Sequence, residues 1–145
     1  IVREAFALRD LRSRFKNMAV DMKMPILIVD DYKTMLRIVR NLLKQFGFEN
    51  VDEAANGGEA FNKMKEKQYG LVISDWNMEP VTGIQLLQQV RADANMKDTP
   101  FIIITAESKA ENVIAAKEAG VSNYIVKPFN AETLKQKLTA VLGAF

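Results

Sequence analysis

Cysteine and histidine are both absent from the 145 residues of this chain. Without cysteine the protein can form neither a disulfide framework nor a thiolate metal site, and nothing indicates an oxidising compartment, so the expected location is the cytoplasm. Without histidine it lacks the most common general base and the imidazole metal ligand. Any chemistry must therefore rest on carboxylates, lysine and hydroxyl groups.

Long apolar runs are also missing. No stretch approaches the roughly 20 apolar residues that a transmembrane helix needs, and the N-terminus lacks the apolar core of a secretion signal, so no membrane partner is expected. Apolar residues make up 48% of the chain and charged residues 26%, which is typical of a globular protein with a packed core. The length allows one domain and a tail.

The net charge is only +2 and is unevenly placed. Residues 1–23 hold six basic and three acidic groups, so residues 24–145 carry a net charge of −1 and are not expected to bind nucleic acid. We assign residues 1–23 as a leader and residues 24–145 as the domain. The leader could be an amphipathic helix, but a disordered or non-native extension is favoured, because disorder concentrates at chain ends.

Short apolar runs alternate with segments of helical periodicity from Pro25 onward. This pattern predicts an α/β protein with five strand and crossover-helix units in a parallel sheet. The predicted strands are Ile26–Val29, Val51–Ala55, Leu71–Ile73, Phe101–Ile104 and Tyr124–Val126. Right-handed crossovers would place helices on both faces of one open sheet, with ligands at the carboxyl ends of its strands.

Apolar stripes mark the helices between these strands. The first stripe comprises Met35, Ile38, Val39, Leu42, Leu43 and Phe46 and stops at Gly47. The next three contain Phe61 and Met64, then Leu86, Leu87 and Val90, then Val113, Ile114 and Ala116 before Gly120. Asn130 is the predicted N-cap of a last helix that carries Leu134, Leu138 and Val141.

Three carboxylates follow neighbouring strands of this sheet. Asp30 and Asp31 come directly after the first strand and Asp75 comes after the third, so all three should project into one crevice. Such like charges raise one another's pKa, and the usual remedy is a hard divalent cation such as Mg²⁺. Taken alone, the Asp30–Asp31 pair is better explained as a helix cap or turn.

A hydroxyl and an ammonium group end the other two strands. Thr105 closes the fourth strand and Lys127 closes the fifth, with Pro128 behind it. Alone, Thr105 is better read as an ordinary β-branched strand residue, and Lys127 could be a solvated lysine. Together with the three acids they form the set that a phosphoryl group on a carboxylate requires: a nucleophile, a metal and donors for the phosphoryl oxygens.

Several longer motifs make this pattern specific. They are Val29-Asp30-Asp31, the helix segment 37–44, Val72-Ile73-Ser74-Asp75-Trp76-Asn77-Met78, Thr105-Ala106-Glu107 and Val126-Lys127-Pro128-Phe129. These runs resemble the receiver domains of two-component response regulators, and among them the chemotaxis regulators of the CheY type. The resemblance covers residues 25–142. It implies a single doubly wound (βα)5 flavodoxin-like domain with strand order 2-1-3-4-5.

The resemblance implies a role for each acid. Asp75 would be the phosphoacceptor, which attacks the phosphohistidine of a kinase and becomes an acyl phosphate. Asp31 and Asp75 would ligate Mg²⁺ directly, the backbone carbonyl of Asn77 would be a third ligand, and Asp30 would act through a bound water.

The remaining site residues would convert phosphorylation into a change of shape. Lys127, carried on a cis bond to Pro128, would pair with the phosphoryl group, while the Thr105 hydroxyl would move toward it and let Tyr124 turn inward. Ala106 and Glu107, with Asn77, resemble the fast-decaying chemotaxis type, so the phosphorylated form should last seconds to minutes.

The expected partners follow from the same resemblance. A CheA-like histidine kinase would phosphorylate the protein, and the flagellar motor switch protein would bind the face of the fourth helix, fifth strand and fifth helix, which includes Lys109, Tyr124 and Lys137. A phosphatase is a further candidate partner, and a monomer is expected. Because the chain ends after the last helix, output should be protein binding, and the protein should be a switch that catalyses only its own phosphorylation and dephosphorylation.

Three alternatives remain open. A phosphate sink would drain the kinase without touching the motor. A Mg²⁺-dependent phosphohydrolase would need a second catalytic acid two residues after its nucleophile, where Asn77 stands, and asparagine is neither an acid nor a base. A flavin-binding module is disfavoured because the acids crowd the crevice that an anionic phosphate would need.

The chain departs from the family pattern in one loop. Receivers commonly carry proline directly after the methionine that corresponds to Met78, whereas here Glu79 takes that position and Pro80 follows. The departure leaves the shape of this loop, and any phosphatase docking there, undetermined.

Overall fold

The computed structural model describes residues 20–106 and 110–145, which form five strands and five helices in alternation. The strands are β1 (Ile26–Val29), β2 (Val51–Ala54), β3 (Leu71–Asp75), β4 (Phe101–Thr105) and β5 (Asn123–Val126). The helices are α2 (Lys33–Gln45), α3 (Gly57–Glu66), α4 (Gly83–Ala92), α5 (Ala110–Glu118) and α6 (Ala131–Leu142).

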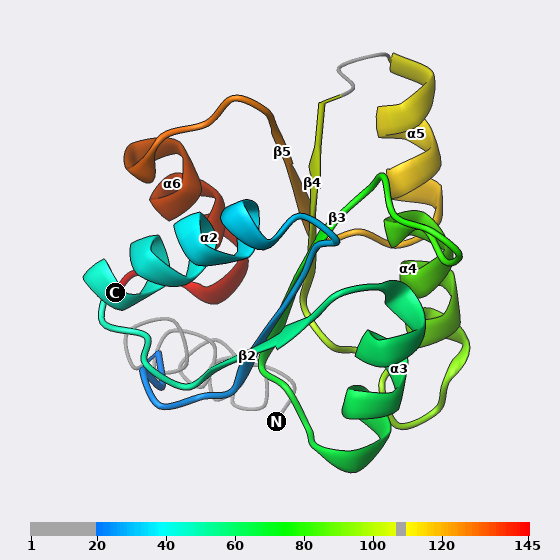
Figure 1. Ribbon diagram of the computed structural model, residues 1–145, viewed down its shortest axis with the longest axis horizontal. Coiled ribbons are helices and arrows are strands. Elements are labelled where there is room, and N and C mark those ends of the chain that lie inside the picture. Colours follow the sequence, from blue (N-terminus) through cyan, green and yellow to red (C-terminus); the bar gives the residue numbers. More distant parts are fainter. Residues whose placement is uncertain (1–19, 107–109) are drawn as a thin grey trace, which may run out of the picture.

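All five strands lie parallel in one sheet, in the order β2-β1-β3-β4-β5. The predicted fold class and strand order are therefore confirmed. Helices α2 and α6 cover one face of the sheet and α3, α4 and α5 cover the other (Figure 1). This doubly wound arrangement leaves β2 and β5 as the two edge strands.

Alternate residues of the strands enter two separate apolar cores, because successive strand side chains point to opposite faces. Ile26 and Ile28 pack in the cluster that contains Leu43 of α2. Leu27 and Val29 pack in the other cluster, with Leu86 of α4. The near-continuous apolar runs of the sequence thus reflect a sheet buried on both faces.

Local signals set the ends of the helices. Asn130 caps α6, its side chain accepting a hydrogen bond from the Thr133 backbone N–H, as predicted. Gly47 and Gly120 follow α2 and α5 with φ of 102° and 90°, a left-handed conformation that glycine adopts without steric cost. No helix in the described part of the chain is both long and apolar enough to span a membrane.

Two residues of the predicted apolar stripes are not buried. Ile38 is 44% exposed on α2 and Ile114 is 55% exposed on α5, so their assignment to the core was wrong. At 3.6 residues per turn, each of them stands two positions from a buried helix residue, Leu36 or Ala116, and so falls on nearly the opposite side. The sequence pattern included them in the predicted buried stripes because both residues are apolar.

Strands β3 and β4 run further than their apolar residues indicated. Asp75 pairs with Ile104 and Thr105 pairs with Val126, so both polar residues belong to the sheet. In contrast, Ala55 lies beyond β2, and Asn123 already belongs to β5. Two residues of the predicted site are therefore held by strand pairing rather than carried on loops.

Most of the predicted leader, residues 1–19, lies outside the described residues. The Val20 and Met22 side chains, which belong to its last part, pack against the core on the α2 and α6 side. The boundary at residue 24 stays a prediction.

Candidate functional site

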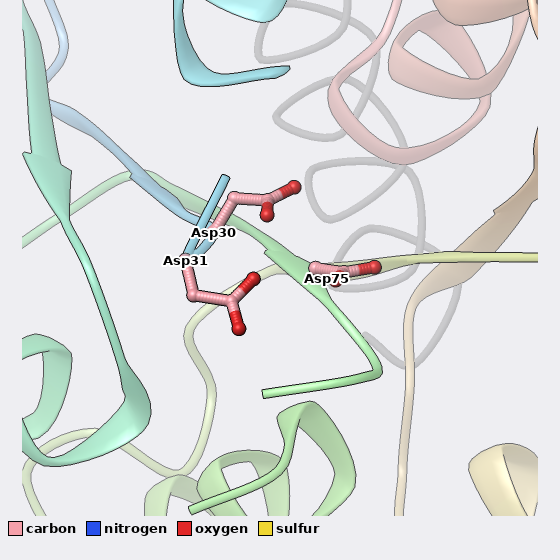
Figure 2. A group of neighbouring side chains, drawn as sticks. All are labelled: Asp30, Asp31 and Asp75. Atoms are coloured by element: carbon pink, nitrogen blue, oxygen red, sulfur yellow. The ribbon is translucent and has the colours of Figure 1, made fainter. Parts of the chain in front are cut away.

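The three predicted acids meet at the carboxyl ends of β1 and β3. These two strands are neighbours, with Val29 opposite Ser74, so Asp30 and Asp75 are next to each other across the sheet. Carboxylate oxygens of Asp30, Asp31 and Asp75 lie within 4.8 Å of one another. Figure 2 shows the three side chains extending from these strand ends into the same space.

Burial makes this acid cluster electrostatically costly. Asp30 is 4% exposed and Asp75 is 5% exposed, whereas Asp31 is exposed to solvent. Burial is the main reason that the pKa of Asp30 is raised to about 6, and the nearby charge of Asp75 adds to the effect. The Tyr32 backbone N–H donates to Asp30 Oδ1 at 2.9 Å and opposes the rise.

The donor set fits a hard divalent cation. Three carboxylates converge, and oxygen donors of this kind are the ligands that Mg²⁺ prefers. Asn77 lies exposed in the loop between β3 and α4, close in sequence to Asp75. Burial and, to a smaller extent, the charge of Asp75 raise the pKa of Asp30, and a cation would oppose both effects by favouring the ionised carboxylate.

Lys127 supplies a positive charge directly to the acid cluster. Its Nζ lies 3.0 Å from Asp75 Oδ1, and its backbone N–H donates to the Thr105 carbonyl at 2.7 Å. The Lys127–Pro128 peptide bond is cis, as expected. The chain thus leaves β5 with the lysine aimed at the neighbouring strand ends.

The two predicted switch residues stand on either side of a small internal space. Thr105 is 3% exposed at the end of β4, and Tyr124 is half-buried on β5. With Trp76 they line a void of about 10 Å³ next to α5. Lys137 of α6 places its Nζ 5.1 Å from the centre of the Tyr124 ring, which is a cation–π distance.

Not every predicted site residue can be placed. Ala106 is exposed directly after Thr105, whereas Glu107 and Lys109 lie outside the described residues. Trp76 is half-buried against the core on the α3 and α4 side.

Gly83 is a residue of the site that sequence reasoning missed. A Cβ atom on Gly83 would lie 2.1 Å from the carbonyl oxygen of Asp75 and 3.1 Å from Cα of Trp76. The Gly83 N–H also donates to the Trp76 carbonyl at 2.9 Å, which closes the loop that follows β3. In the sequence, the only signal for this contact was a glycine that follows Thr82 and precedes an apolar run. The contact itself is tertiary, so spacing along the chain could not predict it.

The helix behind this loop begins at a capping box. The Thr82 side chain accepts from the Gln85 N–H, and the Gln85 side chain accepts from the Thr82 N–H. Within the loop the Glu79–Pro80 peptide bond is cis, which the sequence did not indicate. The loop is thus anchored at both ends, although its sequence departs from the pattern of receivers.

Comparison with known proteins identifies the family. The family model for the response regulator receiver domain matches residues 26–139. The chain belongs to this family. The acid cluster, Lys127 and Thr105 of this receiver domain therefore occupy strand ends of a known signalling fold.

Curated relatives of this receiver domain are chemotaxis proteins. It is 51% identical over 118 residues to chemotaxis protein CheY-3 of Vibrio cholerae, a match that covers 81% of this chain and 91% of that protein. It is 46% identical over 118 residues to chemotaxis protein CheY of Pseudomonas aeruginosa, covering 81% and 95%. The solved structure of V. cholerae CheY4 superposes with a TM-score of 0.77 at 36% identity, covering 83% of this chain and 99% of that one.

The first prediction concerns the buried Asp30 carboxyl in metal-free protein. Its pKa is 3.8 ordinarily and about 6 in the fold, so the folded state binds this proton more tightly than the unfolded state. Stability from this group is therefore full below about pH 4 and is lost as the pH rises to about 6. We expect Asp30→Asn to raise the unfolding free energy at neutral pH by about 1–3 kcal/mol.

Urea unfolding across this pH range measures the effect. Asp31→Asn is the matched control. Asp31 is exposed, so replacing its carboxylate should remove little desolvation cost. Equal stabilisation by both variants, or a gain from Asp30→Asn that is also present at pH 3, would contradict the prediction.

The second prediction concerns the close approach of Gly83 to the backbone carbonyl oxygen of Asp75. We expect Gly83→Ala to lower the unfolding free energy by about 2 kcal/mol or more, because backbone atoms must move to admit the methyl group. Gly58→Ala is the control, because a Cβ there would lie 3.4 Å from a side-chain oxygen of Asn56, which is nearly an ordinary van der Waals distance. Its change should stay within about 1 kcal/mol. If thermal and urea unfolding give equal losses for the two variants, the steric argument is wrong.

Proposed function

We propose that this receiver domain is a single-domain chemotaxis response regulator that accepts a phosphoryl group on Asp75. The observation that carries the proposal is the buried Asp75 carboxylate, which lies beside two further carboxylates and 3.0 Å from Lys127. The names of the curated relatives support the chemotaxis role. The proposed phosphodonor is a CheA-like histidine kinase in the cytoplasm.

The proposed reaction is a direct transfer to a carboxylate oxygen. An Asp75 oxygen attacks the phosphorus of the phosphohistidine, an oxygen–phosphorus bond forms and the phosphorus–nitrogen bond breaks. The imidazole leaves with the electron pair and takes a proton from solvent. Lys127 donates to a phosphoryl oxygen, for which it is positioned by its contact with Asp75.

The metal ligands in this proposal are those implied by the family. Asp31, Asp75 and the Asn77 backbone carbonyl would hold Mg²⁺, with Asp30 acting through water, and the bound ion would neutralise charge on the transferred phosphoryl group. The fit of three converging oxygen donors supports this assignment. The protein's own carboxylates position the cation and exclude anions until it is bound.

A buried hydroxyl next to the acceptor links the reaction to output. We propose that Thr105 moves toward the phosphoryl group, because charged phosphoryl oxygens are strong hydrogen-bond acceptors for its hydroxyl. The void shared by Thr105, Trp76 and Tyr124 supports a coupled movement of the tyrosine ring. Ala106 is small and would leave room for a water to attack the phosphoryl group, so a lifetime of seconds to minutes is proposed.

The proposed output surface is formed by α5, the edge strand β5 and α6. It carries Tyr124 and, 5.1 Å from the tyrosine ring, Lys137, and α5 exposes Ile114. An exposed apolar residue, an aromatic ring and a cation suit a protein partner. The proposed partner is the flagellar motor switch protein. We propose that the receiver domain binds it as a monomer. It would catalyse only its own phosphorylation and dephosphorylation.

The third prediction tests phosphorylation. Titration with Mg²⁺ should quench Trp76 fluorescence, and acetyl phosphate should then produce a further change, because Trp76 follows the acceptor directly. In Asp75→Asn the donor-dependent change should be lost, since the amide is not a nucleophile. A donor response that survives in Asp75→Asn would place the acceptor elsewhere, and no response in the parent protein would overturn the proposed function.

The fourth prediction tests the output surface. The phosphorylated protein should bind the N-terminal peptide of a flagellar motor switch protein, and Lys137→Glu should weaken that binding about tenfold or more by reversing a charge beside Tyr124. Lys65→Glu on α3 is the matched control and should bind normally. Fluorescence anisotropy of a labelled peptide measures the affinity of each variant. If the phosphorylated parent protein does not bind the peptide, the result would favour a phosphate sink.

A further inference from the structure

Two clefts open from the acid cluster, and Asp31 lines both of them. The first, here the α2 cleft, has a volume of about 510 Å³ and lies between α2 and the end of β2. The second, here the Glu79 cleft, has a volume of about 310 Å³ and is lined by the loop that follows β3. Carboxylate oxygens of Asp31 and Asp75 lie within 4.8 Å of each other, so both clefts come close to Asp75.

The walls of the two clefts differ in charge. The α2 cleft adds three cations, Lys33, Arg37 and Arg40, against two acids outside the central cluster. One of those acids, Glu53, is paired with Arg40 at 2.6 Å. The Glu79 cleft adds only Glu79, with Asn77, Met78 and Thr82 as its uncharged lining. Outside Asp30 and Asp31, the lining of the α2 cleft is therefore net positive and that of the Glu79 cleft is negative.

Glu79 holds this position without being a metal ligand candidate. It is exposed and lies outside the group of three carboxylates that can hold a cation. Among the described residues no ion pair neutralises it. Its loop is anchored by the Thr82 cap and by the hydrogen bond from Gly83 to Trp76, so the charge stays at the mouth of the site.

We propose that Glu79 determines which phosphodonors this receiver domain accepts. Its carboxylate repels dianionic donors from the Glu79 cleft and attracts cations there, so that anionic donors approach Asp75 along the α2 cleft. The inference rests on the proposed phosphorylation of Asp75. It also gives a role to the residue at which this chain departs from the common receiver pattern.

Acetyl phosphate is a suitable probe because it is a small dianion. Asp75 attacks its phosphorus, the bond from phosphorus to the acetyl oxygen breaks, and acetate leaves with the electron pair. With saturating Mg²⁺, Glu79→Gln should be phosphorylated roughly two- to fivefold faster than the parent at about 0.02 M salt. The difference should shrink at about 0.3 M salt, where charges are screened over a few ångströms.

Further variants separate charge from loop shape. Glu79→Lys should accelerate the reaction more than Glu79→Gln, and Arg37→Gln should slow it, because Arg37 lines the other cleft. Phosphoramidate, which carries less negative charge near pH 7, should respond less to all three changes. Glu66→Gln is the control, since Glu66 lines a different cleft with Tyr69, at the other end of β3.

A second readout does not depend on the reaction. Without any donor, Glu79→Gln should weaken Mg²⁺ binding by up to about twofold in a Trp76 fluorescence titration, because the same carboxylate attracts the cation. Equal phosphorylation rates for parent and Glu79→Gln at both salt concentrations would overturn the inference and leave phosphorylation itself intact. An acceleration that is equal for both donors and insensitive to salt would also overturn it. Failure of the parent to be phosphorylated would instead overturn the proposed function.

Discussion

The gathering of three carboxylates, those of Asp30, Asp31 and Asp75, at a partly buried place is the constraint on which the rest of the site depends. Their oxygens lie within 4.8 Å of one another, and burial raises the pKa of Asp30 to about 6. This shift corresponds to a cost of about 1–3 kcal/mol for Asp30 at neutral pH in metal-free protein. The strands beneath it are lined by fully buried apolar side chains, each of which contributes about 1.5–3 kcal/mol, so the fold outweighs the cost.

The parallel sheet concentrates this cost in one place. Because all strands point the same way, the polar residues at their carboxyl ends gather at one edge of the sheet, while apolar residues fill the two cores. Strand pairing holds the backbone of Asp75 and Thr105, whereas Lys127 and Asn77 lie on loops. The parts proposed to bind and respond to charge are therefore arranged around Asp75, the proposed phosphoacceptor.

The geometry of the loop after β3 affects how a phosphodonor would approach Asp75. Gly83 lets the start of α4 touch the Asp75 carbonyl, and this contact fixes the path of the loop that carries Glu79. The same loop walls one of the two clefts beside the acids. The proposed role of Glu79 follows from this arrangement, because the α2 cleft carries three cations whereas the Glu79 cleft adds only a carboxylate.

The sequence by itself determined the fold class, the strand positions, the Asn130 cap and the identity of the acids at the strand ends. These follow from local periodicity, capping and the order of residues. It misplaced Ile38 and Ile114, because apolar character does not say which side of a helix meets the core. Only the tertiary structure decided the 3.0 Å contact of Lys127 with Asp75, the fit of Gly83 and the two unlike clefts. Each joins residues far apart in the chain or depends on the path of a loop, and sequence spacing carries no information about such distances.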